Sequence, residues 1–113
     1  MTLRQLQSEF TLLQAKFVLA AYNLGYELTD GDAFRDPRVH GAMGTKQSYG
    51  HRNSCHKIRL ARDYNLFKDG KYLPATADYK ILGELWESMH PLARWGGRFE
   101  DGNHFSFEYE GHM

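Results

Sequence analysis

The strongest constraint on the fold is an apolar stripe that runs along residues 3–24. Apolar side chains return there at intervals of three and four residues, as they do on one face of an α-helix. The stripe consists of Leu3, Leu6, Phe10, Leu13, Phe17, Ala20, Ala21 and Leu24. Gly25 then ends the predicted helix. Because the polar face, with Arg4, Gln7 and Glu9, has no concentration of basic residues, we expect the stripe to pack on a protein core and not on a membrane.

Short alternating segments predict a small sheet. Residues 26–29 alternate as a short strand does, and residues 57–67 mix apolar and charged side chains as a strand through the middle of a sheet would. Asp69 and Gly70 mark a tight turn after that strand. Residues 105–109 alternate apolar with polar side chains, which predicts a strand with one face in water.

A second helix is predicted over residues 77–89. Tyr79, Leu82, Trp86 and Met89 fall on one side of it, Thr76 is in position to cap its start, and His90-Pro91 ends it. Two amphipathic helices and several short strands predict an α+β fold. We expect the helices to pack on one face of a small antiparallel sheet.

The length, the net charge and the cysteine content favour a single-domain protein that binds neither nucleic acid nor membrane. The 113 residues predict one domain, residues 1–113, and the formal net charge of zero leaves no basic field to gather a nucleic acid. The single cysteine, Cys55, cannot form an internal disulfide, which suits a reducing cytoplasm. No apolar run resembles a signal peptide or is long enough to cross a bilayer, so no stable membrane insertion is expected.

Two distant segments carry the residue types of a catalytic zinc site. His56 and Asp63 lie in the first segment, and Asp101 and His104 in the second. A catalytic zinc usually takes three protein ligands, from His nitrogen and Asp or Glu oxygen, and leaves a position open for water, whose pKa falls to about 7. A nearby carboxylate must accept the proton of that water. Gly102 and Asn103 predict a tight loop between Asp101 and His104, and this short step can aim such a base and a ligand at one metal.

The period of a strand adds detail to this site. In a strand at residues 57–67, Asp63 shares a face with Ala61 and Asn65, so a small Ala61 leaves room beside a metal ligand. Cys55 is expected to point away from its neighbour His56 and to be a buried structural thiol. Trp95 and Phe99 either form a wall of the active site or belong to the core, and Trp95 is one of several candidates for substrate contacts. The others are Gln47, Tyr49 and Arg52.

Three motifs between Ser54 and Phe105 occur together in one family of enzymes, and the resemblance to that family extends over about residues 27–108. They are Ser54-x-His56 with Ala61-x-Asp63, then Trp95-Gly-Gly-Arg-Phe, then Asp101-x-x-His104-Phe105. With these motifs the chain resembles the M15 family of zinc peptidases. It is most similar to the small phage-type members, the L-alanyl-D-glutamate endopeptidases that act as endolysins. D-Ala-D-Ala carboxypeptidases and dipeptidases share the same core motif.

The resemblance implies an M15-like fold with the zinc site on the open face of the sheet. It implies that His56, Asp63 and His104 bind one Zn²⁺, that Asp101 is the catalytic base, and that Arg35 meets the substrate or the oxyanion. The implied reaction is hydrolysis of the L-Ala-D-Glu bond of the peptidoglycan stem peptide by metal-activated water, as in phage lysis of a bacterial cell wall.

Alternatives remain open within and outside this class. Arg59 stands where many M15 members have glycine, a difference that bears on substrate choice, and the bond cut could be D-Ala-D-Ala. A metal-dependent nuclease is disfavoured by the zero net charge. A catalytically silent wall-binding or virion component is disfavoured by the intact ligand and base residues. We expect a monomer in the cytoplasm of a bacterial host that reaches the wall through a separate export factor.

Overall fold

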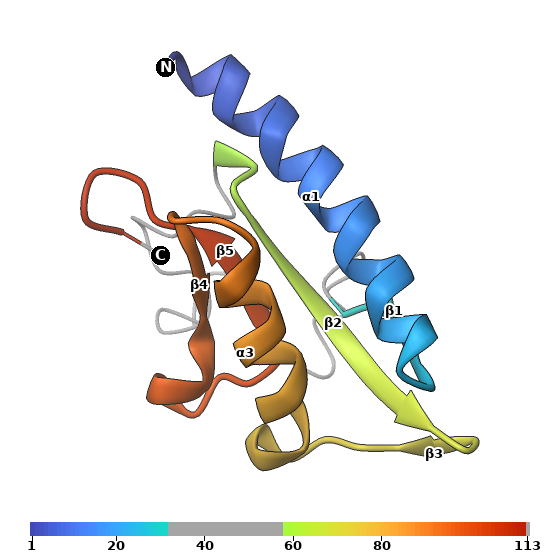
Figure 1. Ribbon diagram of the computed structural model, residues 1–113. Helices are drawn as coiled ribbons and strands as arrows, with labels where there is room; N and C mark the ends of the chain where they lie inside the picture. Colours follow the sequence, from blue (N-terminus) through green and yellow to red (C-terminus); the bar gives the residue numbers. More distant parts are fainter. Residues whose placement is uncertain (32–57, 113) are drawn as a thin grey trace, which may run out of the picture.

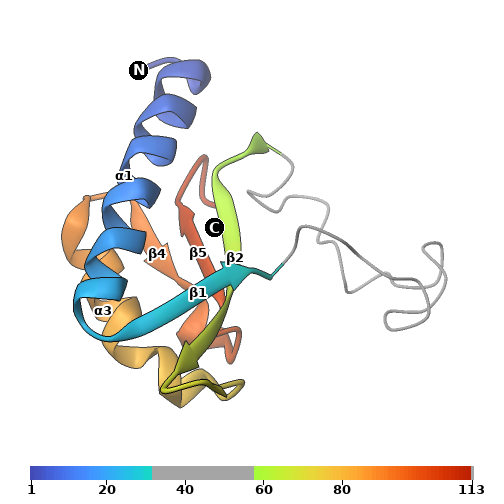
Figure 2. The ribbon, with the colours of Figure 1, turned by 90° about the vertical axis from the view of Figure 1, so that its right-hand side faces the viewer.

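Residues 1–31 and 58–112 are the part of the chain that the computed structural model describes (Figure 1). Their antiparallel sheet has the strand order β1-β2-β5-β4, and β3 pairs with β2 outside that path. The strands are β1 (Tyr26–Asp30), β2 (Ala61–Lys68), β3 (Lys71–Tyr72), β4 (Ala93–Trp95) and β5 (His104–Phe107). The helices are α1 (Leu3–Asn23), α3 (Lys80–Met89) and two short 3-10 helices, η3 (Thr76–Tyr79) and η4 (Gly96–Phe99). The predicted α+β class is confirmed, with α1 and α3 on the same side of the sheet (Figure 2).

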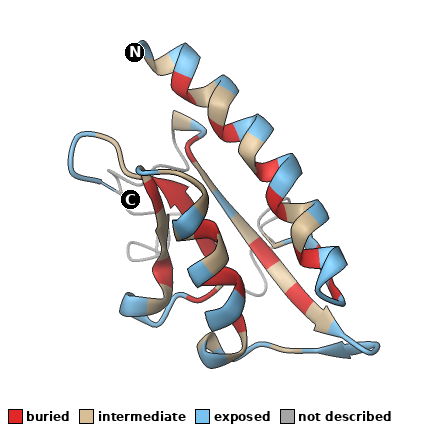
Figure 3. Cartoon of the chain, viewed as in Figure 1, coloured by how far each residue is buried: buried red, intermediate tan, exposed pale blue. Residues whose placement is uncertain are grey.

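Helix α1 follows the apolar stripe closely. The Thr2 side chain and Gln5 form a capping box at its start, and Gly25, with φ of 91°, follows the cap residue Leu24 at its end. Figure 3 shows the buried residues of α1 along the side that faces the sheet. Within residues 1–31 and 58–112, no helix combines the length and the apolar character that crossing a membrane requires.

An aromatic cluster joins the helices to the centre of the sheet. Phe105 of β5 lies 4.9 Å from Phe17 of α1 between ring centroids, and Phe107 lies 5.1 Å from Phe10. Trp86 of α3 stacks on Phe107 at 6.0 Å. Because side chains alternate across a strand, the even-numbered residues of β5 face away from the helices.

Strand β5 departs from its prediction. The alternation in residues 105–109 predicts a face in water, but β5 begins at His104, ends at Phe107 and is buried at all four positions. Its position between β2 and β4 closes both of its edges, and the burial of all four residues shows that neither of its faces is open to water. The expected strand at 57–67 also begins later, at Ala61, because Arg59 takes a left-handed φ of 60°.

The predicted capping role of Thr76 is wrong. Thr76 begins η3, and α3 starts only at Lys80 without a side-chain cap. The Thr76 hydroxyl instead accepts a hydrogen bond from the backbone N–H of Gly102, at 3.2 Å. The Thr76 hydroxyl, which would have capped a helix, is therefore used in a contact with Gly102, a residue distant in sequence.

The predicted turn after β2 is confirmed. Lys68 pairs with Lys71, and the two residues between them, Asp69 and Gly70, have φ of 53° and 78°. Two consecutive positive φ values are typical of the type I′ hairpin turn, for which Asp-Gly is a favoured sequence. This turn lets β3 fold back on the end of β2.

Two buried tyrosines should make the fold sensitive to alkali. Burial raises the pKa of Tyr64 and of Tyr79 to about 12, and their hydroxyls donate to Gln14 Oε1 at 2.6 Å and to the Tyr64 carbonyl at 2.8 Å. The neutral phenols therefore stabilise the fold fully below pH of about 10, and this contribution is lost as the pH rises toward 12. We expect the free energy of unfolding to fall there by about 1.4 kcal/mol per pH unit for each tyrosine.

Urea denaturation at a series of pH values measures this slope. Tyr79→Phe should remove about half of the tyrosine contribution and Tyr64→Phe the other half. The same slope in the double variant as in the unchanged protein would contradict the assignment.

Candidate metal centre

The pairing of β2 with β5 brings two of the predicted ligands face to face. Asp63 is the register partner of His104, although the two are 41 residues apart in sequence. Ladder hydrogen bonds from Tyr64 N to Asn103 O (3.0 Å) and from Phe107 N to Leu60 O (2.9 Å) flank this register. They place Asp63 and His104 in a non-hydrogen-bonded pair, the arrangement in which opposite side chains approach most closely.

The distance between the Asp63 and His104 side chains matches the distance between two ligand atoms of a tetrahedral zinc ion. His104 Nδ1 lies 3.3 Å from Asp63 Oδ1, and the side chains are only 11% and 15% exposed. A charge-assisted hydrogen bond is shorter, at about 2.7–2.9 Å. Tetrahedral zinc with bonds of about 2.0–2.1 Å separates its ligand atoms by about 3.3–3.4 Å. The pair therefore fits two corners of a zinc tetrahedron, and it forms a long hydrogen bond when no metal separates the two atoms.

Small residues occupy the next pair along the same face. Ala61 is the register partner of Ser106, and the alternation of burial along β2 places Ala61 with Asp63 on the face away from Tyr64 and Leu66, as the strand period predicts. Ser106 Oγ is buried and has no hydrogen-bond partner, the only such side-chain atom in the described part of the chain. No bulky neighbour from this pair covers the Asp63–His104 pair.

The charge of Arg62 is directed away from this site. Arg62 follows Ala61 on the opposite face of β2, where its guanidinium donates to both carboxylate oxygens of Asp30, at 3.0 and 3.2 Å. Its positive charge is thus paired on the helix side of the sheet.

A tight turn delivers Asp101 and His104 together. The His104 N–H donates to the Asp101 carbonyl at 3.1 Å, so the two residues are the first and last positions of a β-turn. This confirms the predicted tight loop. Gly96 lies against the turn: a Cβ at Gly96 would come within 2.4 Å of the Asp101 carbonyl oxygen and 2.9 Å of His104 Cβ. Asp101 itself is exposed, whereas His104 is buried.

Several of the predicted site residues lie outside the described ranges. His56, the third expected ligand, and Arg35 are among them, as are Cys55 and three candidates for substrate contacts, Gln47, Tyr49 and Arg52. Among residues 1–31 and 58–112, no three His, Cys, Asp or Glu side chains form a group that could hold a metal ion. The described part of the site therefore consists of two possible metal ligands, Asp63 and His104, and the carboxylate of Asp101 at the other end of the turn that precedes His104.

The two aromatic residues with open roles have different surroundings. Trp95 is partly buried and packs against the core, whereas Phe99 is 67% exposed. Trp95 also donates a hydrogen bond to Gly102, the residue that follows Asp101, and Thr76 binds the same residue. The sequence pattern predicts neither of these contacts. The only signal was the concentration of glycines around the Asp101–His104 motif.

Comparison with known proteins assigns no family to the chain. A scan against models of protein families finds no match, and a search of curated proteins finds none either. The likeness to M15 peptidases therefore rests on the three motifs alone.

Proposed function

We propose that this protein is a zinc-dependent peptidoglycan peptidase, an endolysin-like hydrolase of the L-Ala-D-Glu bond of the stem peptide. The observation that carries the proposal is the Asp63–His104 pair. A carboxylate oxygen and an imidazole nitrogen lie 3.3 Å apart in a largely buried position, and the register between two paired strands holds them opposite each other. His56 is the proposed third ligand, and Arg35 the proposed contact to substrate or oxyanion.

The residues of the site divide the work of hydrolysis. A zinc ion at the three ligands would supply a Lewis acid that acidifies water and polarises a peptide carbonyl. Asp101 takes the proton of the attacking water and returns it to the leaving amine. Asp63, as a carboxylate, and His104, as a neutral imidazole, offer the lone pairs that a metal requires. The side chains of His104 and Asp63 are only 11% and 15% exposed, which favours retention of a metal.

The exposure of Asp101 supports a polymeric substrate. A base that lies on the surface of the protein can be reached by a peptide that is still attached to a cell-wall network. A closed pocket would admit only a released fragment. We propose further that the protein acts as a monomer and that a separate factor carries it from the host cytoplasm to the wall.

Mass spectrometry of digested peptidoglycan tests the proposal. Zinc-loaded protein should produce stem peptides cut between L-Ala and D-Glu, with a free L-Ala carboxyl terminus and a new amino terminus on D-Glu. Protein stripped of metal by a chelator is the control and should release nothing until zinc is restored.

Other products would identify the alternatives. Release of D-Ala with the rest of the stem intact would assign D-Ala-D-Ala carboxypeptidase activity. Sedimentation of the protein with peptidoglycan, without any cleavage, would contradict the proposed enzymatic activity and support the alternative that the protein is a wall-binding component.

A further inference from the structure

One residue of the Asp101–His104 turn is held from both sides. The indole Nε1 of Trp95 donates to the carbonyl oxygen of Gly102 at 2.7 Å, and the N–H of Gly102 donates to the hydroxyl of Thr76 at 3.2 Å. Gly102 is buried, and it separates Asp101 from the strand that begins at His104. Both backbone polar groups of this residue are therefore satisfied by side chains from elsewhere in the fold.

Close packing leaves Gly102 little room to move. A Cβ at Gly102 would come within 2.7 Å of the Cα of Thr76, which is a distance that real Cβ atoms do not adopt. The turn therefore lies directly against the start of η3. Thr76 contacts Gly102 through its backbone as well as through its hydroxyl.

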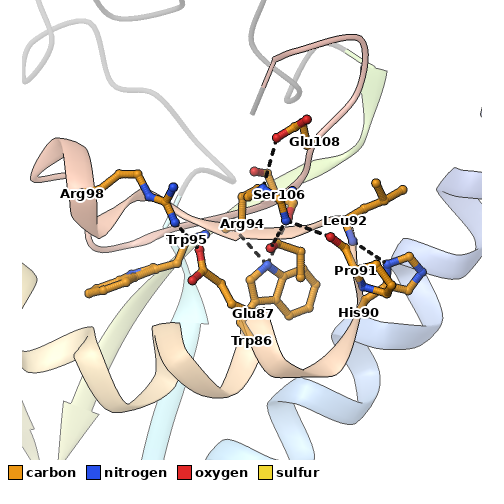
Figure 4. Close-up of polar contacts among 11 residues, drawn as sticks. Trp86, Glu87, His90, Pro91, Leu92, Arg94, Trp95, Arg98, Ser106 and Glu108 are labelled. Carbon is orange, nitrogen blue, oxygen red and sulfur yellow. Dashed lines mark hydrogen bonds and ion pairs between the residues drawn. The ribbon is translucent and has the colours of Figure 1, made fainter.

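The indole of Trp95 is itself a rigid anchor. Its ring lies between two glycines, since a Cβ at Gly83 of α3 or at Gly97 of η4 would come within 2.1 or 2.2 Å of ring carbons. The backbone N–H of Trp95 donates to Glu87 Oε2 at 2.9 Å, and the same oxygen accepts from Arg98 at 3.0 Å. Figure 4 shows Glu87 between Arg98 and Trp95. Contacts with α3 and η4 therefore fix the position of the indole independently of its hydrogen bond to the turn.

His104 and Asp101 depend on these contacts to different degrees. His104 belongs to β5, and the ladder with β2 holds it through the bond from Tyr64 N to Asn103 O. Asp101 lies on the other side of Gly102, outside every strand and exposed to solvent.

The backbone of Asp101 is held by hydrogen bonds from its own N–H to the Gly96 carbonyl (3.0 Å) and from His104 N to its carbonyl (3.1 Å). A loss of the contacts to Gly102 would loosen the turn between these two bonds. The Asp101 side chain would then shift while the Asp63–His104 pair stays in register.

We infer that Trp95 and Thr76 are positioning residues, which hold Gly102 so that Asp101 stays within reach of the reacting groups at the metal. This inference rests on the proposed function and gives Trp95 and Thr76 a role that acts on Asp101 through Gly102. Displacement of a catalytic group by about 1 Å can lower a rate by about 100-fold. We expect the loss of one hydrogen bond to Gly102, with the other retained, to lower kcat by about 10-fold.

The test uses Trp95→Phe, which removes the N–H donor and keeps an aromatic ring, and Thr76→Val, which replaces the hydroxyl with a methyl group. Thr76→Ser keeps the hydroxyl and should restore kcat. Trp86→Phe is the matched control, because Trp86 is also a buried indole that donates to backbone carbonyls but does not contact the turn. It should lower thermal stability and leave kcat unchanged within about twofold at a temperature where the variant is folded.

Two readouts are independent of activity. Zinc affinity, measured by competition with a chelator, should stay within twofold of the unchanged protein, because Asp63 and His104 remain in place. Exchange of the Gly102 amide hydrogen with solvent should accelerate in Thr76→Val and not in Thr76→Ser. Thermal unfolding of each variant confirms that kcat is measured on folded protein.

The outcomes separate this inference from the proposed function. A lower kcat with unchanged zinc affinity, restored by Thr76→Ser, supports it. Unchanged kcat in Trp95→Phe and Thr76→Val, or a parallel loss of zinc affinity, contradicts it while the unchanged protein still cleaves the stem peptide. Absence of cleavage by the unchanged protein contradicts the proposed function and removes the catalytic role of Trp95 and Thr76 with it.

Discussion

Asp101→Asn should lower kcat by about 1,000-fold while the protein still binds one zinc ion. Asn has nearly the shape of Asp but cannot accept the proton of the attacking water, and general base catalysis contributes about 100- to 10,000-fold to such reactions. The turn should persist, because the hydrogen bond from His104 N goes to the backbone carbonyl of residue 101 and not to its side chain. Steady-state kinetics on a soluble stem peptide, together with zinc stoichiometry, measure both effects.

Glu100→Gln is the matched control for this substitution. Glu100 is the exposed carboxylate next in sequence, and its change to Gln removes the same charge from the same surface. Its kcat should stay within about twofold, because solvent screens the charge of an exposed carboxylate. A loss of zinc in Asp101→Asn would show that Asp101 is a ligand, and the base would then have to be sought elsewhere.

His104→Ala should lower zinc affinity by more than about 100-fold, since even residues that only orient a ligand contribute about 10- to 100-fold. The imidazole supplies one of the two donor atoms that lie 3.3 Å apart, and alanine supplies none. Metal analysis after dialysis and competition with a chelator measure the loss. Peptidase activity should disappear with the metal.

Ser106→Ala is the control for His104→Ala. Ser106 is buried on the same face of β5, two residues along, and its hydroxyl has no partner to lose. This variant should keep its zinc and gain slightly in stability, because an unsatisfied buried hydroxyl is costly. An unchanged zinc stoichiometry in His104→Ala would exclude His104 from the ligand set.

Local sequence patterns predicted the pieces of this fold better than their assembly. The stripe of α1, the Asp69-Gly70 turn and the turn between Asp101 and His104 each depend on neighbouring residues, and each was found where it was predicted. The end of α3 at Met89, before His90-Pro91, is a further case. These features are encoded within a few residues, so a single sequence is enough to locate them.

The contacts that assemble the site depend on residues far apart in the chain. Nothing in the periodicity of β2 reveals that Asp63 will face His104, or that β5 will lie between two other strands and be buried on both faces. Thr76 looks like a helix cap until the Gly102 amide, 26 residues later, is placed beside it. The likeness to M15 peptidases predicted that Asp63 and His104 bind the same metal ion. The register of the sheet places these two residues opposite each other.

The register between β2 and β5 also makes zinc binding by the proposed ligands Asp63 and His104 a reporter of correct folding. A slip of β5 by one residue would turn Phe105 and Phe107 out of the aromatic cluster and His104 into it. Burial of each phenylalanine is worth several kcal/mol, so the core strongly rejects such a misaligned sheet. The packing interactions that stabilise the protein therefore also enforce the alignment of Asp63 with His104. If the two residues bind zinc as proposed, only molecules with the native alignment would take up zinc during refolding.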